Sequence, residues 1–148
     1  MRKLRFVWLT ISAAIAMPGI AQAQDTSAKL LFEKYKLIGT FAFDCSKPPA
    51  DNNRYYVHRV MPTAHVQRDM MSGPTTRDFA VIWAQGQDLT GNQIALTGTR
   101  DGQPLTSTYL IEGNRLRVME STVAGKKEIE GGRFVGSGPT PWANRCPG

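Results

Sequence analysis

Cysteine and histidine are scarce in this chain, which has two of each among its 148 residues. Catalytic dyads and zinc sites are built from these residue types at defined spacings, so a small supply leaves few ways to assemble one. The sequence also lacks a Gly-x-Ser-x-Gly motif, a phosphate-binding loop and a dinucleotide fingerprint. We therefore expect a protein that is not an enzyme and that carries no cofactor or metal.

Clustered positive charge is also missing. The chain has 18 basic and 12 acidic residues, but three of the basic residues lie within positions 1–23. Beyond that segment the only adjacent basic pair is Lys126-Lys127, which is followed by Glu128 and Glu130. We interpret these two glutamates as part of a solvated strand face and not as a catalytic carboxylate pair. A nucleic-acid surface gathers basic and aromatic residues on one face, so nucleic acid is not an expected partner.

The N-terminal segment has the three-part layout of a secretory signal peptide. Basic residues precede an uncharged run over 6–23, and a small-x-small triplet places the cleavage point between Ala23 and Gln24. A proline and a glycine interrupt the run, which disfavours a membrane anchor as the alternative. We expect residues 1–23 to be removed and residues 24–148 to form one periplasmic or secreted domain without a membrane span.

The two cysteines, Cys45 and Cys146, both belong to the expected exported domain. In an oxidising compartment such a pair is more often bridged than free, so a single disulfide is predicted. The alternative is a catalytic cysteine, which requires a nearby base. The position of Cys146 two residues before Gly148 favours the disulfide, which would fasten the C-terminal tail to the first strand-like segment.

Turn residues recur with a period typical of an antiparallel meander. Gly91, Gly102, Gly113 and Gly125 follow one another at intervals of 11, 11 and 12 residues, the space of one strand and a tight turn. Between such breaks the sequence predicts eight strands, at residues 38–45, 54–61, 64–71, 76–85, 93–100, 105–112, 115–122 and 127–135.

Alternation within these segments predicts one buried face per strand. Phe79, Val81 and Trp83 fall on the same face of their segment. A flat sheet would leave this apolar face and two edges bare, so the fold class we predict is all-β, an eight-stranded antiparallel up-and-down barrel. A short helix with Ser27 as its N-cap precedes the strands and is expected to cover one barrel end, using Leu30, Leu31 and Tyr35.

The opening Gly39-Thr40-Phe41 of the first strand resembles the Gly-x-Trp step of lipocalin-type barrels, the wider group that includes the avidins. The segment that runs on into Asp44 and Cys45 is also similar to small exported bacterial proteins of unassigned function. Phe41 stands where that pattern has tryptophan, and no C-terminal helix is expected. The resemblance implies a barrel that holds a ligand, with Gly39 and Phe41 as structural positions.

Soft metal ligands gather in one predicted hairpin. Imidazole and thioether groups favour copper, and this hairpin contains His58, Met61, His65, Met70 and Met71. His58 and Met61 are three residues apart and therefore face opposite sides of a strand. The alternative, that the methionines fill gaps in the barrel, is the one we favour, although the sequence leaves copper binding open.

The predicted barrel interior is the strongest candidate site. Eight strands enclose a space that side chains fill or that holds one small ligand, and the sequence leaves both outcomes open. The first hypothesis is an exported, non-enzymatic barrel that binds a small, partly apolar molecule inside. The alternative is a protein-binding module, such as an inhibitor of a periplasmic hydrolase, that acts through the loops at 46–53 and 72–78. The expected ligand-binding residues are Phe41, Phe43, Tyr56, Phe79, Trp83 and Tyr109, with Leu96 and Val118 also predicted inward.

Overall fold

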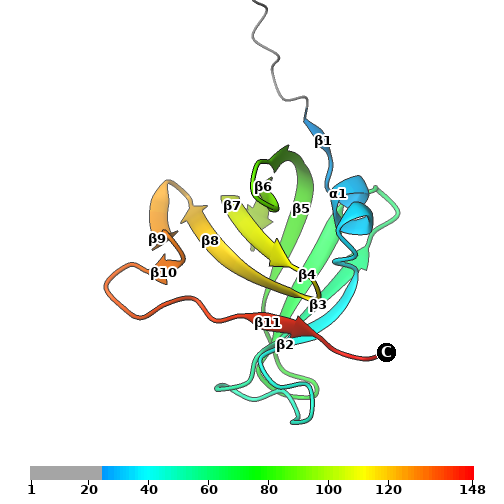
Figure 1. Ribbon diagram of the computed structural model, residues 1–148, viewed down its shortest axis with the longest axis vertical. Helices are drawn as coiled ribbons and strands as arrows, with labels where there is room; N and C mark the ends of the chain where they lie inside the picture. The colour runs from blue at the N-terminus through cyan, green and yellow to red at the C-terminus, as the bar shows by residue number, and fades with distance from the viewer. Residues whose placement is uncertain (1–24) are drawn as a thin grey trace, which may run out of the picture.

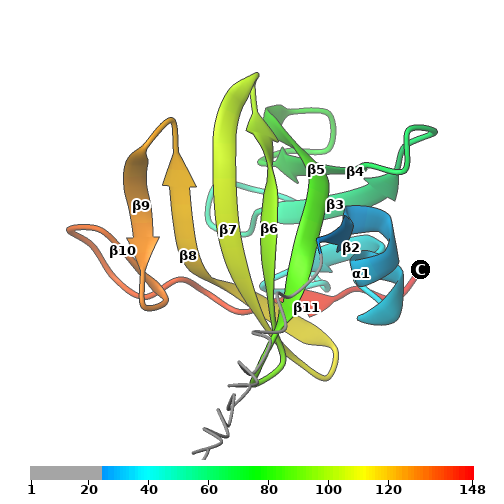
Figure 2. The same cartoon turned by 90° about the horizontal axis from the view of Figure 1, so that it is seen from above.

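The barrel wall is a meander in which each strand from β2 to β8 pairs antiparallel with the next one along the chain. The computed structural model describes residues 25–148, so the predicted leader and its cleavage point lie outside the described residues. Short turns join most of these strands, so each strand pairs with its neighbour along the chain. The sheet curls into a ring, which removes the two open edges that a flat sheet would have (Figures 1 and 2). The strands are β2 (Gly39–Ala42), β3 (Tyr55–Val60), β4 (Val66–Met71), β5 (Arg77–Leu89), β6 (Gln93–Arg100), β7 (Gln103–Glu112) and β8 (Arg115–Val123).

A short strand from the C-terminal tail closes the ring. Strand β11 (Ala143–Arg145) pairs with β2 through Asn144 and Ala42, and with β8 through Ala143 and Leu116. The result is an eight-stranded antiparallel closed barrel, which confirms the predicted fold class.

The identity of the eighth strand differs from the prediction. The segment expected at 127–135 forms β9 (Lys126–Glu130) and β10 (Arg133–Phe134), a hairpin that lies beside the ring and not in it. Two strands share the edge of β8 that does not face β7: its first two residues pair with β11, and its last three pair with β9. The tail that follows β10 is rich in glycine and proline, which disfavour strands, yet pairing on both sides holds three of its residues as a strand.

The predicted disulfide between Cys45 and Cys146 is confirmed. It links positions 101 residues apart, with Cys45 three residues after the end of β2 and Cys146 directly after the end of β11. The backbone amide of Cys146 also donates a hydrogen bond of 2.9 Å to the carbonyl of Thr40. The bridge therefore fastens the closing strand to the first strand of the barrel.

The turn between β6 and β7 shows how the glycine period produces the meander. Arg100 pairs with Gln103, so only Asp101 and Gly102 form the loop. Both have positive φ, at 48° and 81°, which is the conformation that lets a two-residue turn follow the twist of its strands. The Asp-Gly pair suits this geometry because both residue types tolerate left-handed backbone angles.

Helix α1 (Ala28–Lys34) follows the two-residue strand β1 (Thr26–Ser27), which pairs with β5. As predicted, Ser27 is the N-cap, and its side chain accepts a hydrogen bond of 3.4 Å from the amide of Leu30. The helix packs Ala28, Leu31 and Phe32 into the barrel core. Leu30 was expected on the apolar face but is 58 % exposed, because the buried face follows positions three and four apart from Ala28.

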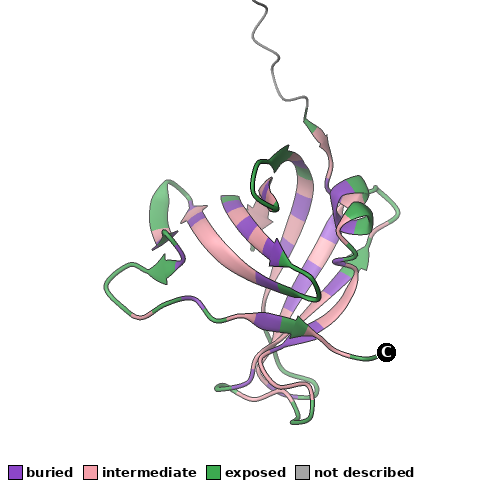
Figure 3. Cartoon of the chain, in the orientation of Figure 1, coloured by how far each residue is buried: buried purple, intermediate pink, exposed green. Residues whose placement is uncertain are grey.

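The core fills the part of the barrel next to this helix. Buried and exposed residues alternate along the wall strands, as the banding in Figure 3 shows. The predicted inward face of β5 is confirmed, since Val81 and Trp83 are fully buried and Phe79 packs against them. Within residues 25–148 no helix has the length and apolar character needed to cross a membrane.

Candidate functional site

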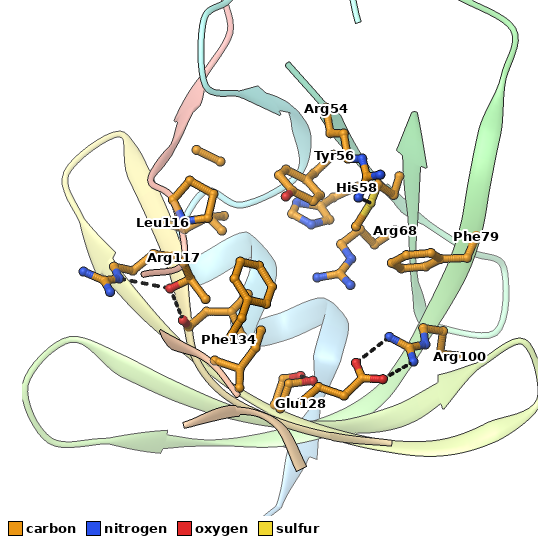
Figure 4. A pocket seen from close by; sticks show the side chains of 18 residues that line it. Arg54, Tyr56, His58, Arg68, Phe79, Arg100, Leu116, Arg117, Glu128 and Phe134 are labelled. Carbon is orange, nitrogen blue, oxygen red and sulfur yellow. Dashed lines mark hydrogen bonds and ion pairs between the residues drawn. The ribbon is translucent and has the colours of Figure 1, made fainter. Parts of the chain in front are cut away.

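The other part of the barrel is hollow. A cavity of about 210 Å³ is bordered by residues from every strand between β3 and β10 and by the tail that follows β10. This volume equals about seven water molecules at roughly 30 Å³ each, which suits a small organic molecule. We call the side bordered by Arg100, Glu128 and Phe134, whose side chains are partly exposed, the mouth of the cavity (Figure 4).

Two of the predicted ligand-binding residues border this cavity. Tyr56 comes from β3 and Phe79 from β5, and Val118, predicted to point inward, borders it from β8. Burial raises the pKa of Tyr56, so its hydroxyl is neutral and acts as a hydrogen-bonding group.

The other predicted residues lie outside the cavity lining. Trp83 and Tyr109 are fully buried in the packed core, where their rings meet edge to face at 5.9 Å, and Leu96 lies in the same core. Phe41 is buried, and Phe43 is half-buried at 6.4 Å from the ring of Tyr56. The structure thus places most of the expected aromatic residues beneath or beside the cavity.

The arginines of the site were not predicted from the sequence. Arg68 on β4, Arg100 on β6 and Arg54 just before β3 all border the cavity, together with a single carboxylate, Glu128. The signal was present in the alternation of β4, where Arg68 lies two residues from Met70 on the inward face. It was passed over because a charged residue within a strand is normally expected to face water.

Arg68 lies between the packed core and the cavity. Only 9 % of this residue is exposed. Its Nη1 donates a hydrogen bond of 2.5 Å to the hydroxyl of Tyr109, and its guanidinium carbon lies 5.7 Å from the ring centres of both Tyr56 and Trp83. Its buried Nε has no hydrogen-bond partner within residues 25–148. Figure 4 shows the guanidinium pointing into the cavity between the rings of Phe79 and Phe134.

Arg100 and Glu128 form a bidentate ion pair at the mouth of the cavity. Nη1 and Nη2 of Arg100 donate hydrogen bonds of 2.8 and 2.6 Å to the two carboxylate oxygens. These hydrogen bonds lower the pKa of Glu128 below its ordinary value and raise the pKa of Arg100. The only carboxylate that residues 25–148 contribute to the cavity lining is therefore already paired.

His58 borders the cavity, and its buried Nε2 has no hydrogen-bond partner within residues 25–148. Its Nδ1 lies 2.8 Å from the carbonyl oxygen of Leu37, which only accepts, so Nδ1 carries the proton. Burial lowers the pKa of His58 to about 3, with a smaller contribution from the charge of Arg68. Met70 shares the cavity with His58, whereas Met71 borders a groove on the outer face, so the soft ligands are divided between the two faces.

The outer groove lies between the two loops that the sequence singled out. Its lining includes Pro49 and Pro74 from these loops, and Asp69, a buried carboxylate that pairs with Arg59 and Arg77. Asn53 belongs to the loop at 46–53 that was expected to act in recognition, but it is only 5 % exposed. Its side chain donates hydrogen bonds to three backbone carbonyls of its own loop and accepts one from the amide of Asp44, so it holds the loop rigid.

Comparisons with family models, curated proteins and solved structures give no match to this chain. The resemblance to lipocalin-type barrels therefore stays a prediction from Gly39, Thr40 and Phe41. Within residues 25–148 no group of three or more histidine, cysteine, aspartate or glutamate residues converges as a metal site.

Proposed function

We propose that this chain is an exported, non-enzymatic barrel that binds one small, partly apolar molecule in its interior cavity. The observation that carries the proposal is the cavity itself, which is about 210 Å³ and lies in a barrel whose remaining interior is tightly packed. Native interiors are close-packed, so a hollow of this size in an otherwise filled core is typical of a binding site.

The lining supports a ligand with an apolar part. Phe79, Val118 and Ile129 offer apolar surface, and Tyr56 adds a polar anchor at the edge. The disulfide and the predicted leader together favour an exported protein, because such bridges persist in oxidising compartments.

The first test is native mass spectrometry of the protein purified from its own compartment, compared with the same sample after unfolding. A mass excess that disappears on unfolding would identify a retained ligand. A second arm uses Val118→Phe, which adds a ring to the cavity wall, with Thr106→Val on the exposed face of β7 as a control. We expect Val118→Phe to abolish ligand retention and Thr106→Val to preserve it. Retention of the same mass by Val118→Phe would contradict binding in the cavity.

The alternative function is binding to another protein through the loops. It is favoured by the groove between the loops at 46–53 and 72–78, and by the hydrogen bonds with which the Asn53 side chain holds the first of these loops in place. The exposed residues for recognition are then Asp51 and Asn52. A panel of cell-envelope hydrolases assayed with the wild type and with Asp51→Ala/Asn52→Ala tests this function. Inhibition that is lost in the double variant would support it, and unchanged hydrolase activity in the presence of the wild type would reject it.

A further inference from the structure

Arg68 is the most unusual group in the described part of the molecule. Buried arginines are almost always paired with an acidic group, because an uncompensated charge away from water is strongly unfavourable. None of the ion pairs among residues 25–148 includes Arg68. Glu128 is the one carboxylate that residues 25–148 contribute to the cavity lining, and both of its oxygens already accept hydrogen bonds from Arg100.

The neighbours of Arg68 only partly compensate its charge. The hydroxyl of Tyr109 accepts one hydrogen bond, and the faces of Tyr56 and Trp83 lie at cation–π distance. These contacts hold the guanidinium in place, but they provide no negative charge and leave Nε unsatisfied. A guanidinium that is fixed, desolvated and unpaired is preorganised to receive an anion, since it offers donors in a planar fork.

We propose that the ligand of this cavity is a monoanion with a short apolar tail, whose carboxylate pairs with Arg68. The proposal rests on the cavity binding described above and adds the chemical class of the ligand. Arg117 also lines the cavity without an acidic partner, but it is only partly buried and donates hydrogen bonds to the carbonyl of Gly132 and the hydroxyl of Thr140. A single negative charge therefore matches the one buried guanidinium of the lining, that of Arg68, which favours a carboxylate over a doubly charged phosphate.

The lining beyond Arg68 accounts for the apolar tail. Phe79 and Phe134 flank the guanidinium in Figure 4, and Leu116, Val118 and Ile129 also border the cavity. Arg68 contacts the packed core through Tyr109 and Trp83, whereas Phe134 is 43 % exposed at the mouth. The carboxylate therefore lies deep and the tail extends toward the mouth.

Octanoate and octan-1-ol provide a matched pair of probes, because they share the tail and differ in the charge of the head group. Calorimetric titration of the full-length mature protein is made with each probe, for the wild type, Arg68→Met, Arg68→Lys and the control Arg133→Met. Arg133 is an exposed residue of β10 outside the cavity lining. Circular dichroism and thermal unfolding establish that each variant is folded.

We expect octanoate to bind the wild type at least about tenfold more tightly than octan-1-ol. A tenfold difference in affinity is about what one hydrogen bond to a charged group contributes. Arg68→Met is expected to weaken octanoate binding roughly ten- to a hundredfold and to leave octan-1-ol binding unchanged. Arg68→Lys retains the positive charge but lacks the planar set of guanidinium donors. Its octanoate affinity is expected to fall between those of the wild type and Arg68→Met. Arg133→Met is expected to match the wild type for both probes.

The outcomes separate the two proposals. Equal binding of the two probes by the wild type would overturn the anion inference while cavity binding stands, and this result needs no variant. An octanoate affinity that a folded Arg68→Met retains would also overturn it. If neither probe binds and the native protein carries no extra mass, cavity binding itself falls, and the anion inference falls with it.

Discussion

Arg100 on β6 and Glu128 on β9 meet as an ion pair, although β7 and β8 separate their strands in the sheet. The pair connects the β9–β10 hairpin, which lies beside the ring, to the far wall of the barrel. It thereby fixes one side of the cavity mouth.

Glu128→Gln removes the negative charge of this pair. Both side chains are partly exposed, so we expect a loss of only about 0.5 to 1 kcal/mol in the free energy of unfolding. Because the pKa of Glu128 is lowered in the folded state, its contribution is present above the ordinary value of 4.5 and is lost as the pH falls through the folded pKa. Urea unfolding at several pH values measures this difference. Glu130→Gln, which breaks a surface pair with Lys127, is the control and should have a smaller effect.

His58 should make the barrel sensitive to acid. Its folded pKa is about 3, below the ordinary 6.5, so between these values the unfolded chain binds a proton that the folded chain does not. The stability of the wild type relative to His58→Gln is therefore expected to fall by about 1.4 kcal/mol for each pH unit as the pH drops through this window. Thermal unfolding of both proteins from pH 7 to pH 4 measures the slope (about three pH units). A parallel dependence in the two proteins would contradict this prediction, and His65→Gln, in the β3–β4 turn, serves as the control.

Loss of the disulfide should release the closing strand first. The bridge encloses a loop of 101 residues, for which the chain-entropy model gives roughly 4 to 5 kcal/mol of stabilisation. Cys45→Ser/Cys146→Ser is expected to lower the free energy of unfolding by up to about this amount. Hydrogen exchange should speed up most at the amide of Arg145, which bonds to the carbonyl of Asn114. Uniform acceleration over the whole barrel would show that β11 does not open separately.

Gly98 on β6 permits a close approach of two strands. A Cβ atom at this position would lie 2.0 Å from the carbonyl oxygen of Ile82 and 2.9 Å from the Cα of Trp83. Gly98→Ala must therefore shift the backbone, and we expect it to cost about 1 to 3 kcal/mol or more in unfolding free energy. Gly138→Ala, where a Cβ meets nothing within 4 Å, is the control and should be nearly neutral. Chemical denaturation of the two variants measures the difference.

The parts of the fold that the sequence predicted are those with a local signal. The glycine period located the turns, as at Gly102, and alternation located the inward face at Val81 and Trp83. Strand β11 gave no such signal, because its three residues are held by β2 on one side and β8 on the other and not by their own propensity. Tertiary pairing decided this element.

In the candidate site, too, the sequence predicted what has a local signal and not what depends on tertiary packing. Aromatic residues were expected to line the interior, but pattern alone does not show how deep each lies, and Trp83 and Tyr109 belong to the packed core. Arg68 was overlooked although its inward position followed from the alternation of β4. The reason is physical: a buried arginine is unfavourable without an acidic partner, and the adjacent Asp69 lies on the opposite face of the strand, where it pairs with Arg59 and Arg77.

The position of β11 has a consequence for how the protein is made. The strand that completes the ring, β11, follows all the other barrel strands along the chain, and it inserts between the first strand of the wall and the seventh. A nascent chain that lacks β11 retains two unpaired edges, one on β2 and one on β8, and such edges promote association with other chains. Completion of the barrel therefore waits until β11 has been synthesised, and a chain truncated before β11 forms an open sheet instead of a smaller barrel.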